Sequence, residues 1–212
     1  MKKKFLSIIL AVGVIATPII TTTAVYASQN DKNSNYEIND NVTKTKKATI
    51  SGISFSYEDA PESVKSDYLK NARALGVQVT NDSNIFIPDF DISKYNLNKS
   101  DSQKAAVESW AIQDYGSYFV STELYTGRQY TVSKSTLVGY NHITSGNPVH
   151  LTQLLLNIFA YKYPGHNSVA VDSMFGINTH NAVLSFQQFA GLSNDATVGP
   201  NTWNAFSSYC LN

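Results

Sequence analysis

The sequence predicts an α+β fold overall, with a C-terminal all-α three-helix bundle preceded by a small α+β domain. Apolar residues recur at helical spacing in residues 61–75 and 149–161. Residues 118–124 and 128–132 have the composition of strands and are separated by a Thr-Gly turn. A turn-plus-helix unit occurs twice with an offset of 23 residues, which predicts two further helices.

The N-terminus has the features of a secretory signal peptide, which we expect over residues 1–27. Three lysines follow the first methionine, then comes an apolar run, and small residues precede the expected cleavage after Ala27. An uncleaved membrane anchor is the alternative, but Gly13 and Pro18 interrupt the apolar run. The mature protein is therefore expected to be secreted, extracellular or cell-wall associated, with no membrane segment after cleavage.

Residues 28–48 are polar and are expected to form a flexible linker. The signal peptide holds three of the 16 basic residues and none of the 16 acidic residues, so the mature chain has a net charge of −3. This net charge leaves no basic surface that would bind nucleic acid.

A single cysteine, Cys210, excludes an internal disulfide and is expected to be a small buried side chain. We expect a monomer.

Residues 49–140 are expected to form the small α+β domain. Its first helix should span residues 61–75, with Gly76 as its stop. Residues 86–88 should be extended, because a residue before proline avoids the helical region. A second helix is predicted over residues 101–115, ahead of the two strands. Alternatively, the whole region is an elaborated lead-in packed on the C-terminal module.

The C-terminal part, residues 145–212, contains the repeated unit. Asp172–Phe186 can be laid over Asp195–Tyr209. The aspartates can close tight turns, the glycines permit positive φ or close backbone approach, and the threonines are expected to cap helices. The paired positions are Asp172 and Asp195, Gly176 and Gly199, and Thr179 and Thr202.

A longer pattern carries a family resemblance. Asp-x-x-Phe-Gly-x-x-Thr-x-x-Ala-Val-x-x-Phe-Gln-x-x-x-Gly-Leu, then Asp-x-x-Val-Gly-x-x-Thr-Trp, runs from Asp172 through Trp203. It resembles the peptidoglycan-binding domain family found in many wall hydrolases. The resemblance implies a three-helix module that binds peptidoglycan and covers about the last third of the chain. The family commonly has Asp-Gly at both turns, whereas this chain has Asp172-Ser173 and Asp195-Ala196.

No recognisable catalytic constellation accompanies the module. The histidines form no i, i+4 pair and no His-x-His, so no metal or cofactor is expected, although His142 with His166 stays open. His150 and His180 are expected on helices, exposed to solvent. Glycan cleavage needs one or two carboxylates, and Glu108 is a weak catalytic candidate. A helical glutamate four residues after a lysine, as Glu108 is after Lys104, more often forms an ion pair on the surface. If Glu108 is catalytic, its possible partners are Asp114 and Glu123.

Candidate ligand-binding residues are amides suited to sugar hydroxyls and peptide carbonyls, and aromatic rings suited to sugars. These residues are Asn178, Asn181, Asn201, Asn204, Trp203, Tyr161 and Tyr163. The amides could instead cap helices, and Trp203 could fill the helix-packing core. The leading hypothesis is a secreted wall protein that binds peptidoglycan through its C-terminal module. The alternatives are a glycosidase-like wall hydrolase with its active site in residues 49–140, and a secreted interaction protein whose module has lost its ligand.

Overall fold

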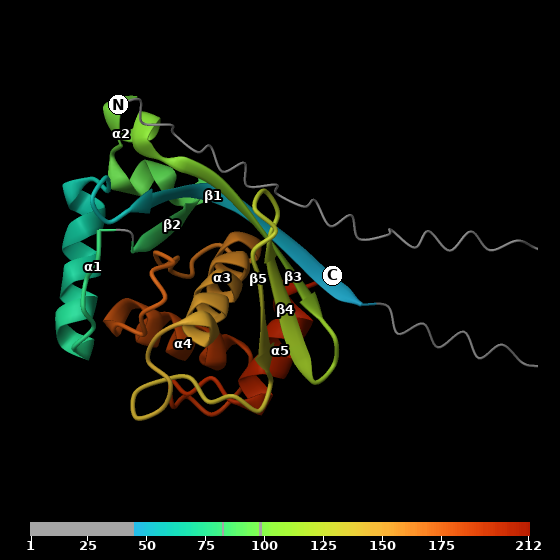
Figure 1. Cartoon of the computed structure of the whole chain (residues 1–212). Helices are drawn as coiled ribbons and strands as arrows, with labels where there is room; N and C mark the ends of the chain where they lie inside the picture. Colours follow the sequence, from blue (N-terminus) through green and yellow to red (C-terminus); the bar gives the residue numbers. More distant parts are fainter. Residues whose placement is uncertain (1–44, 82, 98) are drawn as a thin grey trace, which may run out of the picture. The chain divides into compact units, whose positions relative to one another are not determined.

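A computed structural model describes residues 45–81, 83–97 and 99–212 (Figure 1). The expected signal peptide and nearly all of the expected linker lie outside the described residues. Within the described part of the chain, no helix is long and apolar enough to cross a membrane. Helices and a sheet are both present, so the expected α+β fold class is confirmed.

The N-terminal part is built on a five-stranded antiparallel sheet with the strand order β2-β1-β3-β4-β5 (Figure 1). The strands are β1 (Lys46–Ser56), β2 (Asn84–Pro88), β3 (Ala106–Asp114), β4 (Tyr118–Glu123) and β5 (Gln129–Ser133). β4 and β5 lie where the sequence predicts strands. β1 begins three residues inside the expected linker, and its Lys47 exchanges two backbone hydrogen bonds with Asn212, at 3.0 and 3.1 Å.

β3 lies where the sequence predicts a helix, so that prediction is wrong. Only α2 (Lys99–Lys104) is helical there. Trp110 and Ile112 alternate to the buried face of β3, and the strand pairs with β1 on one side and β4 on the other. A central strand gains two hydrogen-bonded neighbours, and this tertiary pairing outweighs the helical reading of the local sequence.

Short helices cover the β2 end of the sheet. α1 (Glu62–Leu75) ends at Gly76 in a left-handed cap with φ of 65°, as its sequence predicts. Val64, Tyr68 and Ala72 on its inner face pack with Phe55 of β1. A 3₁₀ helix, η1 (Asp89–Tyr95), follows β2 directly.

The C-terminal region is helical, with α3 (Asn147–Lys162), α4 (Ile177–Phe189) and α5 (Pro200–Cys210). α3 is buried continuously from Val149 to Ala160. α4 and α5 cover one side of α3, and the sheet covers another (Figure 1). The rings of Phe186 and Phe206 stack between α4 and α5, with centroids 4.1 Å apart.

One hydrophobic core joins the sheet to these helices. Ile50, Trp110 and Phe119 of the sheet belong to the same buried cluster as Leu154 and Trp203 of the helices. The N-terminal region therefore packs directly on the C-terminal helices.

The two C-terminal turns are held by buried glutamines. Gln153 Nε2 donates to Asp172 Oδ1 at 2.6 Å and to Thr179 Oγ1 at 3.1 Å. Gln187 makes the same contacts to Asp195 and Thr202, at 3.0 and 3.3 Å. The threonines were expected to cap the helices, which is wrong: α4 and α5 begin after glycines and have no side-chain cap.

Candidate binding site

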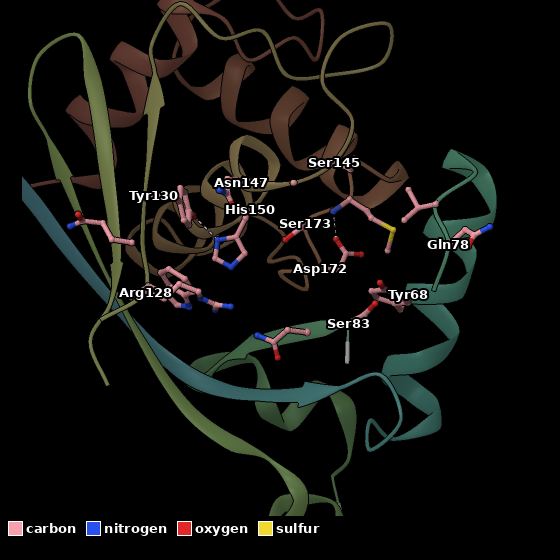
Figure 2. A pocket seen from close by; sticks show the side chains of 16 residues that line it. Tyr68, Gln78, Ser83, Arg128, Tyr130, Ser145, Asn147, His150, Asp172 and Ser173 are labelled. Atoms are coloured by element: carbon pink, nitrogen blue, oxygen red, sulfur yellow. Dashed lines mark hydrogen bonds between the residues drawn. The ribbon is translucent and has the colours of Figure 1, made fainter. Parts of the chain in front are cut away.

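A cavity of about 360 Å³ lies where the sheet, α1 and the start of α3 meet (Figure 2). Its floor and walls come from segments that are far apart in the sequence. The lining residues used below are Tyr68, Gln78, Asn84, Trp110, Arg128, Tyr130, Ser145, Asn147, His150, Asp172 and Ser173.

Arg128 is the cation at this cavity. It follows Gly127, whose φ of 73° closes the turn between β4 and β5. The guanidinium carbon lies 5.0 Å from the centroid of the Trp110 ring, in a cation–π contact. Its Nη2 is 3.8 Å from Glu108 Oε1, and the Arg128 side chain is 56% exposed. This long ion pair leaves the hydrogen-bonding fork of the guanidinium available to a ligand.

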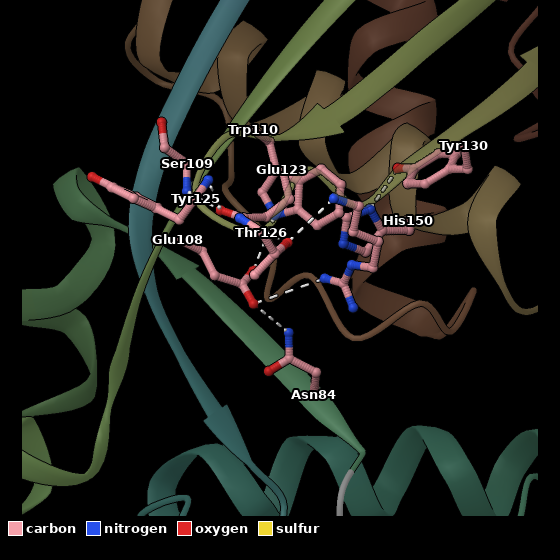
Figure 3. Close-up of polar contacts among 10 residues, drawn as sticks. Asn84, Glu108, Ser109, Trp110, Glu123, Tyr125, Thr126, Tyr130 and His150 are labelled. Carbon is pink, nitrogen blue, oxygen red and sulfur yellow. Dashed lines mark hydrogen bonds and ion pairs between the residues drawn. The ribbon is translucent and has the colours of Figure 1, made fainter. Parts of the chain in front are cut away.

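Glu108 lies on β3, not on the expected helix, and it does not pair with Lys104. Asn84 Nδ2 donates to Glu108 Oε1 at 2.9 Å, and Trp110 Nε1 donates to Oε2 at 3.0 Å (Figure 3). These donors fix the carboxylate of Glu108 beside Arg128.

Glu123, a possible catalytic partner, holds the β4–β5 turn instead. Its two oxygens accept hydrogen bonds from the amides of Ser109, Tyr125 and Thr126 and from the Thr126 hydroxyl (Figure 3). Burial alone would raise the pKa of Glu123, but these hydrogen bonds outweigh it and lower the pKa to about 2. Both carboxylate oxygens are thereby engaged in holding the turn.

His150, expected to be exposed, is buried on α3 at 8% exposure. Its Nδ1 is 2.6 Å from the hydroxyl of Tyr130, and its ring packs edge-on against Trp110. Burial, with a contribution from the Arg128 charge, lowers the pKa of His150 to about 3. The imidazole is therefore neutral at pH 7, and its Nε2 has no hydrogen-bond partner among the described residues.

Asp172 closes the opposite side of the cavity. Its carboxylate accepts hydrogen bonds from Asn71, Gln153 and the amide of Met174. Burial raises the pKa of Asp172, although these hydrogen bonds oppose the shift.

Comparisons with known proteins identify both regions that border the cavity. Residues 46–111 match one family and residues 145–206 match another, each described as "Putative peptidoglycan-binding domain". The C-terminal third thus matches the peptidoglycan-binding domain family that its sequence motifs resemble. The match to residues 46–111 also recognises much of the region that the sequence resemblance left unassigned.

A solved structure extends this comparison. It is the crystal structure of a peptidoglycan-binding protein from Clostridioides difficile in complex with glutamine hydroxamate. The two chains are 29% identical and superpose with a TM-score of 0.61, over 75% of this chain and 92% of the other. No curated protein matches this chain.

The ligand-binding residues predicted in the peptidoglycan-binding module do not form one site. Asn178 and Asn181 line a second cavity of about 340 Å³, whose other walls include Asn71 and Lys94. Asn201 borders a smaller groove beside Leu137.

The predicted aromatic residues are also dispersed. Trp203 is fully buried and donates from Nε1 to the carbonyl of Thr136 at 2.9 Å, so it fills the core and has no face for a sugar. Tyr161 is exposed beside Phe90, with ring centroids 5.4 Å apart. Tyr163 packs among aromatic rings next to Phe159.

Asn204 contacts Lys134, whose Nζ donates to its Oδ1 at 3.2 Å. His166 bonds to Ser185 through Nδ1, at 2.8 Å, and does not meet His142 in a metal cluster. Among the described residues, no group of three His, Cys, Asp or Glu side chains could hold a metal ion. Cys210 is buried, as expected.

Sequence reasoning missed Arg128 and Asn84 and assigned His150 to the surface. Arg128 follows an ordinary turn, and nothing near it in the sequence distinguishes it from a solvent-exposed arginine. Its contact with Trp110 of β3 reaches across β4, which lies between β3 and β5, so only the tertiary structure shows it.

Proposed function

We propose that this protein is a secreted cell-wall protein that binds peptidoglycan, and that the cavity beside Arg128 contacts the polymer. The observation that carries the proposal is where this cavity lies. Tyr68, Asn84 and Trp110 come from the region matching one peptidoglycan-binding family, and His150 and Asp172 come from the region matching the other. A cavity lined by both regions is the place where both could act on one ligand.

The solved relative adds support. That peptidoglycan-binding protein was crystallised with glutamine hydroxamate, which is a derivative of an amino acid. Peptidoglycan also contains amino acids, in its peptide stems. A cavity of about 360 Å³ lined by amide, hydroxyl and guanidinium groups has the size and polarity for such a ligand.

Secretion is part of the proposal because the basic, apolar and small-residue segments of residues 1–27 have the order of a signal peptide. N-terminal sequencing of the exported protein is expected to begin at Ser28. A net charge of −3 after cleavage cannot attract an anionic wall polymer as a whole, so local groups such as Arg128 would supply the contact.

Asn178 and Asn181 are proposed as additional contacts. Both are exposed at the mouth of the second cavity, close to Asn71. Asn71 Nδ2 donates to Asp172, which also lines the first cavity, so the two cavities adjoin at this carboxylate.

Sedimentation with purified peptidoglycan sacculi tests the proposal, using residues 28–212. The unaltered chain is expected to sediment with sacculi in a saturable manner, and Arg128→Gln should lower the bound fraction severalfold. Arg73→Gln is the matched control, because Arg73 is an exposed arginine that lines none of the described cavities.

Thermal unfolding of each variant shows whether the fold is retained. Absence of sedimentation by the folded, unaltered chain would contradict wall binding. Equal sedimentation of the Arg128 and Arg73 variants would keep wall binding but remove it from this cavity.

A further inference from the structure

We propose that the cavity beside Arg128 recognises the stem peptide of peptidoglycan, with a peptide carboxylate bound by the guanidinium, and does not recognise the glycan strand. This inference rests on the proposed function, because it names the part of the polymer that the same cavity takes.

Arg128 is held in position but makes no side-chain hydrogen bond to the described residues. Trp110 supports one face of the guanidinium, and the contact to Glu108 is an ion pair at 3.8 Å rather than a hydrogen bond. No side-chain hydrogen bond of Arg128 is found among the described residues. Guanidinium binds carboxylate through two parallel hydrogen bonds, so a preoriented and unsatisfied guanidinium favours a carboxylate ligand.

The nearby acids do not remove this preference. Glu108 is held by Asn84 and Trp110 independently of Arg128. Asp172 is engaged by Gln153 and by other donors in the interior. Both carboxylates can therefore stay in place while the guanidinium binds a carboxylate from a ligand.

His150 offers a second contact. Because Nδ1 faces the hydroxyl of Tyr130, Nε2 on the other side of the ring faces away from Tyr130 (Figure 2). This nitrogen belongs to a side chain that is more than nine-tenths buried at the cavity wall. At the cavity wall, this ring nitrogen can exchange a hydrogen bond with a polar group of a ligand.

The remaining polar lining suits peptide amides. Asn147, Gln78, Ser145 and Ser173 are among the residues that line the cavity (Figure 2). Asparagine and glutamine side chains offer both a donor and an acceptor, which is the pair of groups that a peptide bond requires.

The aromatic rings of the cavity argue against a glycan. Sugars bind to exposed flat aromatic faces. Trp110 and Tyr68 are 1% and 5% exposed. Tyr130 packs against Trp110 and His150, with ring centroids at 5.8 and 5.6 Å. Exposed rings such as Tyr118 and Tyr161 lie outside this cavity.

Isothermal titration of residues 28–212 tests the inference with three probes. These are a soluble stem peptide with free carboxylates, the same peptide with every carboxylate amidated, and a linear oligomer of N-acetylglucosamine. The free peptide is expected to bind, the amidated peptide to bind roughly 10- to 100-fold more weakly, and the sugar oligomer not to bind. This range corresponds to the loss of hydrogen bonds to a charged group.

Variants of Arg128 connect the effect to the cavity. Arg128→Gln should weaken binding of the free peptide roughly 10- to 100-fold and leave that of the amidated peptide unchanged. Arg128→Lys, which keeps the charge without the fork, should lie between. Arg73→Gln should bind as the unaltered chain does.

Four results would overturn the inference. They are no binding of the free peptide, equal binding of the free and amidated peptides, insensitivity to Arg128→Gln, and binding of the sugar oligomer at this cavity. In each case, continued sedimentation with sacculi leaves the proposed function standing, whereas loss of sedimentation removes both.

Discussion

Ser173 and Ala196 have left-handed backbone conformations, with φ of 61° and 56°. Each follows the aspartate of one C-terminal turn, at the position where the resembling family commonly has glycine. A side chain with a Cβ costs about 1–2 kcal/mol in this region, whereas glycine adopts it freely. The two departures from Asp-Gly therefore leave the turns intact and cost stability.

Ser173→Gly is expected to raise the free energy of unfolding by about 0.5–1 kcal/mol. Relief of the left-handed conformation exceeds the extra chain entropy that glycine loses on folding. Ala196→Gly should gain less, because the Ala196 methyl is buried and its removal costs about 0.8 kcal/mol. Urea unfolding of both variants measures the difference, and a destabilised Ser173→Gly would contradict the strain argument.

His150 makes stability depend on pH. Its pKa is near 6.5 in the unfolded chain and about 3 in the folded protein, because of burial. Between these values the unfolded state binds a proton that the folded state does not. Stability should therefore fall as pH decreases from about 6.5, approaching about 1.4 kcal/mol per pH unit.

Urea unfolding at pH 7, 6 and 5 checks this slope, with His150→Gln expected to flatten it. His142→Gln is the control, since His142 is exposed. The pH range of the measurement should stop at pH 5, because Glu123 and Asp114 have lowered pKa values and add their own loss of stability at lower pH. An unchanged slope in His150→Gln would refute this assignment.

At the scale of elements, a buried ion pair joins the sheet to α5. Lys134 Nζ, directly after β5, lies 2.8 Å from Asp114 Oδ2 at the end of β3, and both side chains are about nine-tenths buried. On α5, Ser207 donates to the same carboxylate and Asn204 accepts from Lys134. Breaking one partner of such a pair leaves a buried charge without compensation.

Lys134→Met is expected to destabilise the protein by about 3–5 kcal/mol, because it leaves Asp114 unpaired. The double variant Lys134→Met/Asp114→Leu should recover much of this loss, since both buried charges are removed. Lys104→Ala serves as the control at the exposed Lys104–Asp59 pair and should change stability by less than about 1 kcal/mol. Thermal unfolding of the three variants measures these differences. Equal effects of the two single variants would contradict the expectation that the buried pair contributes more to stability than the exposed pair.

The helices with strong local signals lie where the sequence predicts them. α1 and α3 were predicted to within about two residues, because apolar periodicity and Gly76 are local signals. β3 was not predicted, because its conformation depends on pairing with β1 and β4. The expected position of Glu108 was wrong for the same reason.

At the scale of the whole molecule, α3 connects the two regions. Because α3 is buried on all sides, other elements must pack against each of its faces. α4 and α5 supply part of that cover, and the sheet supplies the rest. The N-terminal region therefore completes the core of the C-terminal helices.

Residues 145–212 alone are consequently expected to lack a cooperative thermal transition, whereas residues 45–212 should unfold cooperatively. Removal of the sheet would expose the other face of α3 and separate Asn212 from Lys47. Circular dichroism during heating compares the two chains. A cooperative transition in the shorter chain would show that the module folds independently.

The sequence by itself determined the fold class, most helices, the strands around the Thr-Gly turn and the C-terminal family. These features follow from periodicity, turn chemistry and motif spacing, which act over a few neighbouring residues. Only the tertiary structure decided that residues 106–114 form a central strand, that His150 is buried, and that Arg128 and Asn84 meet beside Glu108. Those outcomes depend on contacts between segments far apart in the chain, and no local pattern specifies which distant segments share a core.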